Sequence, residues 1–208
     1  MQPYLAHLVQ TNEIQPVRAR VNILNSEGDV VLQQGSVIDK DNAAQLSRLS
    51  LKRPLIQLIE LEAQFDAELL KQLLEEFITS DNYFEELYQV QDITPRLRRC
   101  ISAYAEHPVL LQLLNVLAIQ LPEIFDQALF CAWMSVCSLN IRECRQEDLD
   151  NAFIAALSHD FGLLFIAPNV DFKSGSLTPE EWQEIQSHPE RGHDLLSNIP
   201  GIAPAVCR

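Results

Sequence analysis

Residues 157–196 read LSHDFGLLFIAPNVDFKSGSLTPEEWQEIQSHPERGHDLL and carry the most informative signals in the chain. The stretch begins with an adjacent histidine and aspartate, His159 and Asp160, followed by Gly162 in a turn. A neutral imidazole and a carboxylate at the end of a helix can both reach one cation, and a carboxylate can bridge two. A His-Asp pair by itself is a weak indication, because most helix-ending histidines followed by a capping aspartate bind no metal.

A helix start is the clearest local signal later in the stretch. Thr178 can cap the helix, Pro179 suits the first helical position, and Glu181 completes a capping box. The helix then carries apolar residues and His188 near one face, and Pro189 marks a bend or a second start. His188 follows His159 by 29 residues, and we expect His159, Asp160 and His188 to come together.

These motifs resemble the HD-GYP subfamily of the HD-domain metal-dependent phosphohydrolases. That family has the sequence HDIGK, a short apolar segment, a proline and a lysine-glycine loop. A helix follows that opens L-T-x-E-E-W and ends in HPxxG. Residues 177–182 (LTPEEW) and 188–192 (HPERG) match in order, and the resemblance covers about 60 residues. The GDVVLQQG stretch at residues 28–35 resembles, more loosely, modules that precede such domains.

The resemblance implies a helical domain that holds two or three iron or manganese ions. These metals would activate a water molecule that attacks phosphorus in cyclic di-GMP. Carried over by position, His159 and Asp160 would be metal ligands, with Asp160 bridging two ions at the catalytic centre. His188 would bind the second metal.

Several positions depart from the family pattern. An ungapped alignment places Gln127 where the family has its first histidine ligand, and we expect Gln127 to lie near His159 on the facing helix. Leu163 replaces a lysine that would face phosphate, and the loop reads Lys173-Ser174-Gly175. The family's remaining histidines, its last aspartate and the G-Y-P segment would lie beyond residue 208.

Two functions follow from these matches and departures. The first is a degenerate or truncated HD-GYP-like domain that acts through protein interaction in bacterial-type cyclic di-GMP signalling. The alternative is a metal-dependent cyclic di-GMP phosphodiesterase whose remaining ligands lie beyond residue 208. Divalent iron or manganese is the expected cofactor if one is bound. The expected partner is a cyclic dinucleotide or a signalling protein, and self-association into a homodimer stays open.

The composition limits the classes of partner. Hydrophobic residues make up 47% of the 208 residues and charged residues 21%, as in a folded globular chain. The net charge of −14 repels nucleic-acid phosphates and anionic lipids, so we expect no DNA, RNA or membrane-surface partner. A small anionic ligand is still compatible, because a bound metal ion can reverse the local field.

The sequence favours the cytoplasm. The first ten residues show neither a basic segment nor an apolar core, so no signal peptide is expected. The richest apolar run, residues 128–139, is shorter than a bilayer span and predicts a buried helix. The five cysteines form no CxxC pair, which suits reduced thiols; three of them, Cys131, Cys137 and Cys144, are spaced to stack on a core face.

The first 62 residues predict a small α+β module. We expect a hairpin of strands at residues 18–24 and 30–32, joined by a turn in which Gly28 can take a positive φ. A helix capped by Asp39 should cover residues 39–49, and a third strand residues 54–59.

The remainder predicts a mainly α protein. A connecting helix is expected within residues 63–91, ending at Ser80-Asp81-Asn82, and an all-helical HD-GYP-like domain, truncated at its C-terminus, over residues 92–208. Prolines 95, 108 and 122 should begin helices, with long helices at about 122–144 and 146–159. We expect Trp133 and Trp182 in the core, His193 at the surface, and no special role for His7 or His107.

Overall fold

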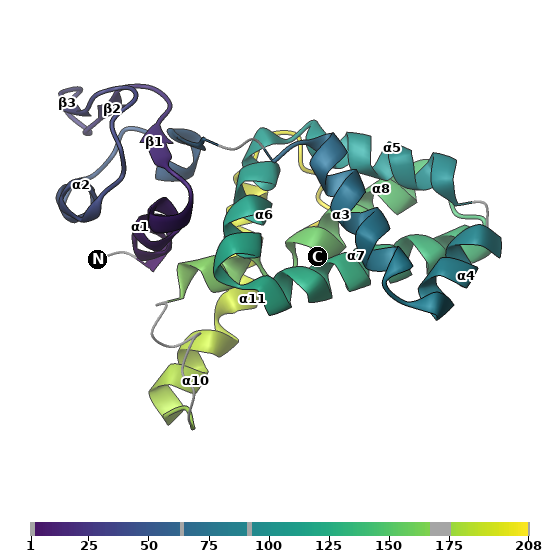
Figure 1. The fold of residues 1–208 in the computed structure, drawn as a ribbon. Coiled ribbons are helices and arrows are strands. Elements are labelled where there is room, and N and C mark those ends of the chain that lie inside the picture. The colour runs from purple at the N-terminus through teal and green to yellow at the C-terminus, as the bar shows by residue number, and fades with distance from the viewer. Residues whose placement is uncertain (1–2, 63–64, 91–92, 167–175, 208) are drawn as a thin grey trace. The chain divides into compact units, whose positions relative to one another are not determined.

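The computed structural model describes residues 3–62, 65–90, 93–166 and 176–207, and these are mainly helical. The chain divides into two compact units, each treated by itself below (Figure 1). The first unit combines Met1–Gln64 with Leu163–His188, and the second combines Phe65–Gly162 with Pro189–Arg208. Mainly α is therefore the observed fold class, with the described strands confined to the N-terminal part of the first unit.

Helix α1 (Pro3–Ile14) opens the first unit and was not anticipated from the sequence. The imidazole Nε2 of the buried His7 lies 3.0 Å from the carbonyl oxygen of Ile166, to which it can donate a hydrogen bond. The rings of Tyr4 and Phe165 stack with centroids 5.1 Å apart. A segment more than 150 residues along the chain is thus tied to α1, a contact that no local pattern reveals.

The strands of the first unit form two antiparallel pairs rather than one hairpin. Strand β1 (Val17–Ala19) pairs with β4 (Ile59–Leu61), and β2 (Ile23–Leu24) pairs with β3 (Val30–Leu32). The β2–β3 turn is held by the Asn25 side chain, which accepts hydrogen bonds from the backbone amides of Glu27 and Asp29. Gly28 adopts φ 96°, as the turn prediction required.

Two strand predictions need correction. The expected strand at residues 18–24 is interrupted between β1 and β2, because its two halves pair with different partners. The expected third strand at residues 54–59 is instead a 3₁₀ turn, η1 (Leu55–Gln57), and the strand follows it as β4. A short apolar run does not distinguish these two conformations. Helix α2 (Lys40–Leu46) is capped by Asp39, whose side chain accepts from the amide of Asn42, as predicted.

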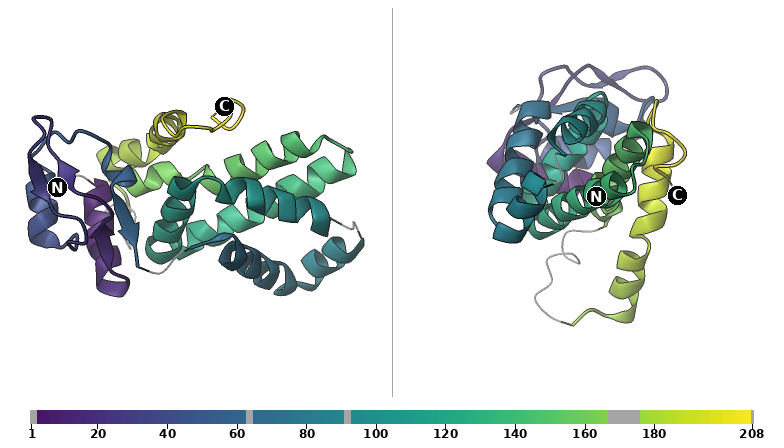
Figure 2. Two further views of the ribbon diagram at one scale, coloured as in Figure 1. Left: turned by 90° about the horizontal axis from the view of Figure 1, so that it is seen from above. Right: turned by 90° about the vertical axis from the view of Figure 1, so that its right-hand side faces the viewer.

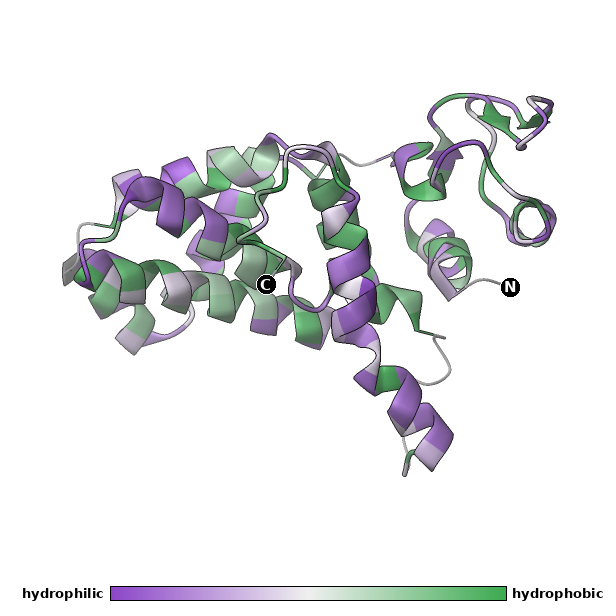
Figure 3. Ribbon diagram, turned by 180° about the vertical axis from the view of Figure 1, so that it is seen from behind, coloured by the Kyte–Doolittle hydropathy of each residue, from purple (hydrophilic) through white to green (hydrophobic). Residues whose placement is uncertain are grey.

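Helix α10 (Pro179–Gln186) begins as its sequence predicts. The Thr178 side chain accepts a hydrogen bond from the Glu181 amide, and the Glu181 carboxylate accepts from the Thr178 amide, which completes the capping box. A second helix, α11 (His188–Ser197), starts directly afterwards, so His188 is the first residue of α11 and not the end of α10. Trp182 is 53% exposed, and the expectation of a core position was wrong. Figure 3 shows α10 as mostly hydrophilic, which agrees with that exposure.

The second unit is a helical assembly in which α7 and α8 form the most extensive contact (Figure 1 and Figure 2). Helices α5 and α3 pack beside this pair, and Trp133, Tyr104 and Phe153 lie fully buried in the core. Prolines start or nearly start three of the helices, as predicted. The helices that precede α11 in this unit are α3 (Ala67–Thr79), α4 (Asn82–Val90), α5 (Thr94–Ala105), α6 (Pro108–Gln120), α7 (Pro122–Ile141) and α8 (Gln146–Ser158).

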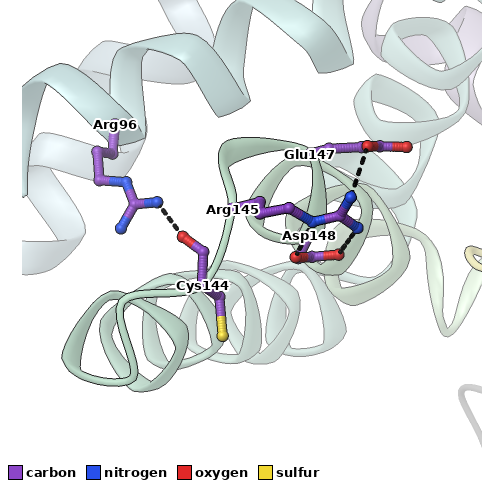
Figure 4. A network of polar contacts seen from close by, with 5 residues as sticks. All are labelled: Arg96, Cys144, Arg145, Glu147 and Asp148. Atoms are coloured by element: carbon purple, nitrogen blue, oxygen red, sulfur yellow. Dashed lines mark hydrogen bonds and ion pairs between the residues drawn. The ribbon is translucent and has the colours of Figure 1, made fainter.

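A polar network secures the turn between α7 and α8. The guanidinium of Arg96, on α5, donates a hydrogen bond to the carbonyl oxygen of Cys144 (Figure 4). It donates a second hydrogen bond to the Asn140 side chain. Gln146 donates back to the carbonyl oxygen of Arg96. The turn contains Glu143 at φ 53°, a left-handed conformation that needs such support in a residue other than glycine.

Helix α7 has 20 residues and, by length and composition alone, could cross a bilayer, a test that the core helix of a globular protein passes equally. Seven of its residues, Trp133 among them, are buried within the fold.

The prediction that Cys131, Cys137 and Cys144 stack on one core face needs correction. Cys137 is buried, whereas Cys131 and Cys144 are only half-buried.

Candidate functional site

The predicted site begins at the end of α8, where His159 follows as the capping residue. Its Nδ1 lies 2.7 Å from the carbonyl oxygen of Ala156, and because a carbonyl only accepts, Nδ1 carries the proton. Its Nε2 lies 3.0 Å from Oδ2 of Asp160. The hydrogen bond to Asp160 is the main cause that raises the pKa of His159 above its ordinary value, and burial acts in the opposite direction.

Asp160 is the less exposed member of the pair. Its side chain is only 14% exposed, whereas that of His159 is 41% exposed. Burial, and then the negative charge of Asp160, raise the pKa of the Cys131 thiol on α7. Gln127 precedes Cys131 by one helical turn on the same side of α7 and is exposed. Its predicted proximity to His159 stays a prediction.

The HD and HPxxG motifs meet through their glycines. A Cβ atom placed on Gly192 would lie 3.6 Å from the amide nitrogen of Gly162 and 3.8 Å from the carbonyl oxygen of His159. Gly192 and Gly162 are both buried. Because those distances are ordinary van der Waals separations, Gly192 gives α11 a close backbone approach to the turn that follows His159.

His188 belongs to the first compact unit, and its neighbour Pro189 to the second. Its Nδ1 lies 2.8 Å from the carbonyl oxygen of Ile185, so Nδ1 donates and the ring turns its Nε2 away from that carbonyl. This is the same tautomer arrangement that metal-binding histidines use. His188 and the His159–Asp160 pair belong to different units, and their expected proximity stays a prediction.

A pocket of about 690 Å³ opens beside His159 within the second unit. His193, which lines it, donates from Nδ1 to the carbonyl oxygen of Cys207 at 2.7 Å. His193 is exposed, as predicted, but its contact with the last turn of the chain was not anticipated. The other residues that line the pocket are Ala155, Pro189, Glu190, Gly192, Asp194, Leu196, Val206 and Cys207.

Two of the positions that depart from the HD-GYP pattern were Leu163 and the loop at residues 173–175. Leu163, which the resemblance aligns with a lysine, is apolar and only 9% exposed. The loop Lys173-Ser174-Gly175 lies outside the described residues.

The donor set fits a metal centre only in part. His159 and Asp160 are adjacent donors, one nitrogen and one carboxylate, of the kind that iron and manganese accept. Within the described part of the chain, no group of three or more His, Cys, Asp or Glu side chains is arranged to hold a metal ion. The described residues therefore supply only part of the ligand set that a metal centre needs.

Comparison with known proteins adds no relative. No family model matches the chain, no curated protein matches it, and no solved structure matches it. The resemblance to the HD-GYP subfamily therefore rests on the motifs of residues 159–196.

Proposed function

We propose that residues 92–208 form a degenerate HD-type helical domain that acts through protein contacts in bacterial-type cyclic di-GMP signalling. The observation that carries the proposal is the contact of Gly192 with the backbone of His159 and Gly162. Gly162 and Gly192, one from each of the two motifs that carry the resemblance, belong to one compact unit although they lie 30 residues apart in the sequence.

The lack of catalytic capacity follows from the chemistry of two positions. Gln127 offers a neutral amide where the family uses an imidazole, and an amide is a much poorer ligand for these metals. Leu163 offers a buried isobutyl group where the family has a cation. A phosphodiester site without that cation and without its first ligand would stabilise the developing negative charge poorly.

The alternative is a metal-dependent cyclic di-GMP phosphodiesterase, which one observation favours. His159 and His188 both donate from Nδ1 to a backbone carbonyl, the arrangement that prepares Nε2 to bind a metal. In His159 that nitrogen faces Asp160, the residue that would bridge two ions. Loss of the proton shared by His159 and Asp160 would free the imidazole Nε2 and the carboxylate to bind a metal ion.

Metal stoichiometry separates the two functions. The purified chain is loaded with Mn²⁺ or Fe²⁺ under anaerobic conditions, passed through a desalting column, and analysed for bound metal beside Asp160→Asn. The proposal expects fewer than two retained ions per chain and the same content in the variant. Two retained ions per chain, lost in Asp160→Asn, would overturn it and favour the phosphodiesterase.

A further inference from the structure

Four aromatic side chains form a continuous surface over α3, α4 and α7 of the second unit, here termed the aromatic face. Phe84 is its centre: its ring lies 5.7 Å from that of Phe77 and 5.7 Å from that of Phe130, between centroids. Tyr83 contacts Phe84 edge-on at 6.2 Å. Tyr83 is 66% exposed and Phe130 is 42% exposed, so the face is open to a partner.

Helix α4 contributes most to this exposure. Its sequence is amphipathic, with Tyr83, Phe84, Leu87 and Tyr88 on one side, yet none of its residues from 82 to 89 is buried. Helix α3, beside it, buries Leu70, Leu74 and Ile78 in the usual way. An amphipathic helix whose apolar side is only half covered is typical of a surface that is completed by a partner.

The charge around the aromatic face is strongly negative. Residues 66–90 contain seven acidic residues and one lysine, and residues 122–141 contain two acidic residues and no basic one. These two segments therefore hold a formal charge of −8, against −14 for the whole chain. The single lysine, Lys71, is held by Glu68 at 2.9 Å. Exposed carboxylates adjoin the aromatic side chains in sequence or by one helical turn: Glu76, Asp81, Glu86 and Asp126.

The negative charge around the aromatic face indicates which kind of partner it can bind. A second copy of the chain would bring two faces of the same sign together, and such a juxtaposition costs several kcal/mol. Nucleic acids and anionic lipid surfaces are repelled for the same reason. A helix with apolar residues on one side and lysine or arginine on the other complements both the aromatic rings and the carboxylates.

We infer that the aromatic face binds a basic amphipathic helix of another protein. Aromatic residues such as Tyr83 supply most of the energy in interfaces of this kind, and the surrounding carboxylates orient the helix and speed its association. This inference rests on the proposed role in protein interaction and adds the chemistry of the partner. The surface is separate from the pocket beside His159, since the residues that line that pocket include none of α3, α4 or α7.

The probe is a fluorescein-labelled peptide of about 18 residues, long enough for five helical turns, with leucines on one side and lysines on the other. Its binding to the full chain is followed by fluorescence anisotropy. We expect saturable binding that weakens as NaCl is raised, and a loss of about tenfold or more in affinity in Tyr83→Ser combined with Phe130→Ser. Trp182→Ser, which removes an exposed aromatic side chain from α10, is the matched control and leaves the affinity unchanged.

A peptide of the same composition with its leucines and lysines shuffled separates recognition from charge attraction. Equal binding of the shuffled peptide, or equal binding by the double variant and the native chain, overturns the inference. If the double variant fails to fold by circular dichroism, Tyr83→Ser alone is used, because that side chain is largely exposed. A shift to a smaller species in sedimentation on loss of Tyr83 would instead identify a second copy as the occupant, and would also overturn it.

The outcomes are distinguishable from those of the proposed function. Cyclic di-GMP turnover with intact peptide binding would overturn the non-catalytic role and leave the aromatic face as inferred. A chain that shows no turnover and binds neither peptide would overturn the inference about the aromatic face and leave the proposed function standing.

Discussion

The Nε2 atom of His159 lies 3.0 Å from Oδ2 of Asp160, while the Nδ1 atom of the same ring faces the carbonyl oxygen of Ala156. Both ring nitrogens therefore face acceptors, which favours the doubly protonated imidazolium. The pair lies at the turn that packs against Gly192, where the two recognisable motifs of the chain meet. Its protonation state is accessible to direct measurement.

Replacing Asp160 with asparagine should lower the pKa of His159. The carboxylate raises this pKa chiefly by accepting the Nε2 hydrogen bond, and an amide carries no charge to favour the imidazolium. The measurement is an NMR titration of the histidine ring protons in chelator-treated protein. Asp194→Asn removes a carboxylate that lines the pocket beside His159 and serves as the control. A His159 titration that is identical in the native chain and in Asp160→Asn would contradict the observed pairing.

The same pair should make stability depend on pH. Because the folded-state pKa of His159 is raised, its contribution to stability is fully present below the unfolded-state value of about 6.5. That contribution is lost as the pH rises through the folded-state pKa. Urea unfolding between pH 5 and 9 should therefore show a smaller loss of stability with rising pH in Asp160→Asn than in the native chain.

The cysteines should react with maleimide in an order set by burial. Burial raises the pKa of Cys137 to about 12, and it also raises the pKa of Cys100, so both thiols should stay unmodified in the folded chain. Cys131, Cys144 and Cys207 are half-buried and should react first. Mass spectrometry of proteolytic fragments gives the order.

Asp160→Asn provides a sharper version of the thiol experiment. Since the charge of Asp160 contributes to the raised pKa of Cys131, its removal should increase the rate at which Cys131 is modified. Cys144, in the turn between α7 and α8, serves as the internal control. An unchanged ratio of the two rates would show that Asp160 does not lie beside Cys131.

Local signals explain which parts of this fold could be predicted. Thr178 and Glu181 form their capping box with atoms only three residues apart, and Asn25 shapes its turn in the same local way. Proline at position 122 begins α7 because its missing amide costs nothing in a first turn. His159 and Asp160 are neighbours in the sequence, so their proximity was predictable, whereas the hydrogen bond between their side chains is visible only in the structure.

Contacts between distant segments account for what was missed. Helix α1 depends on Ile166 and Phe165, which no pattern in its own residues identifies. Cys207 forms part of the pocket wall because its carbonyl oxygen accepts a hydrogen bond from His193, which lies 14 residues earlier in the chain. Trp182 was expected in the core because tryptophans usually are buried, but α10 buries none of its residues.

Arg96 should be a major determinant of stability in the second unit. Its replacement by alanine would remove charge-assisted hydrogen bonds to the part-buried Asn140 side chain and Cys144 carbonyl oxygen, at a cost of about 1.5–3 kcal/mol in unfolding free energy. Lysine should restore only part, since it cannot reproduce the planar fork. Urea unfolding measures the effect. Arg145→Ala is the control, because this fully exposed pair with Asp148 should matter little, and an equal loss there would argue against the network.

Turnover of cyclic di-GMP distinguishes the proposed role, which acts through protein contacts, from catalysis. The purified chain is incubated with cyclic di-GMP and either Mn²⁺ or Fe²⁺, and the products are separated by chromatography beside a metal-only blank. We expect no turnover above the blank, and no difference between the native chain and Asp160→Asn. Turnover above the blank that is abolished in Asp160→Asn would contradict it and would establish the chain as a phosphodiesterase.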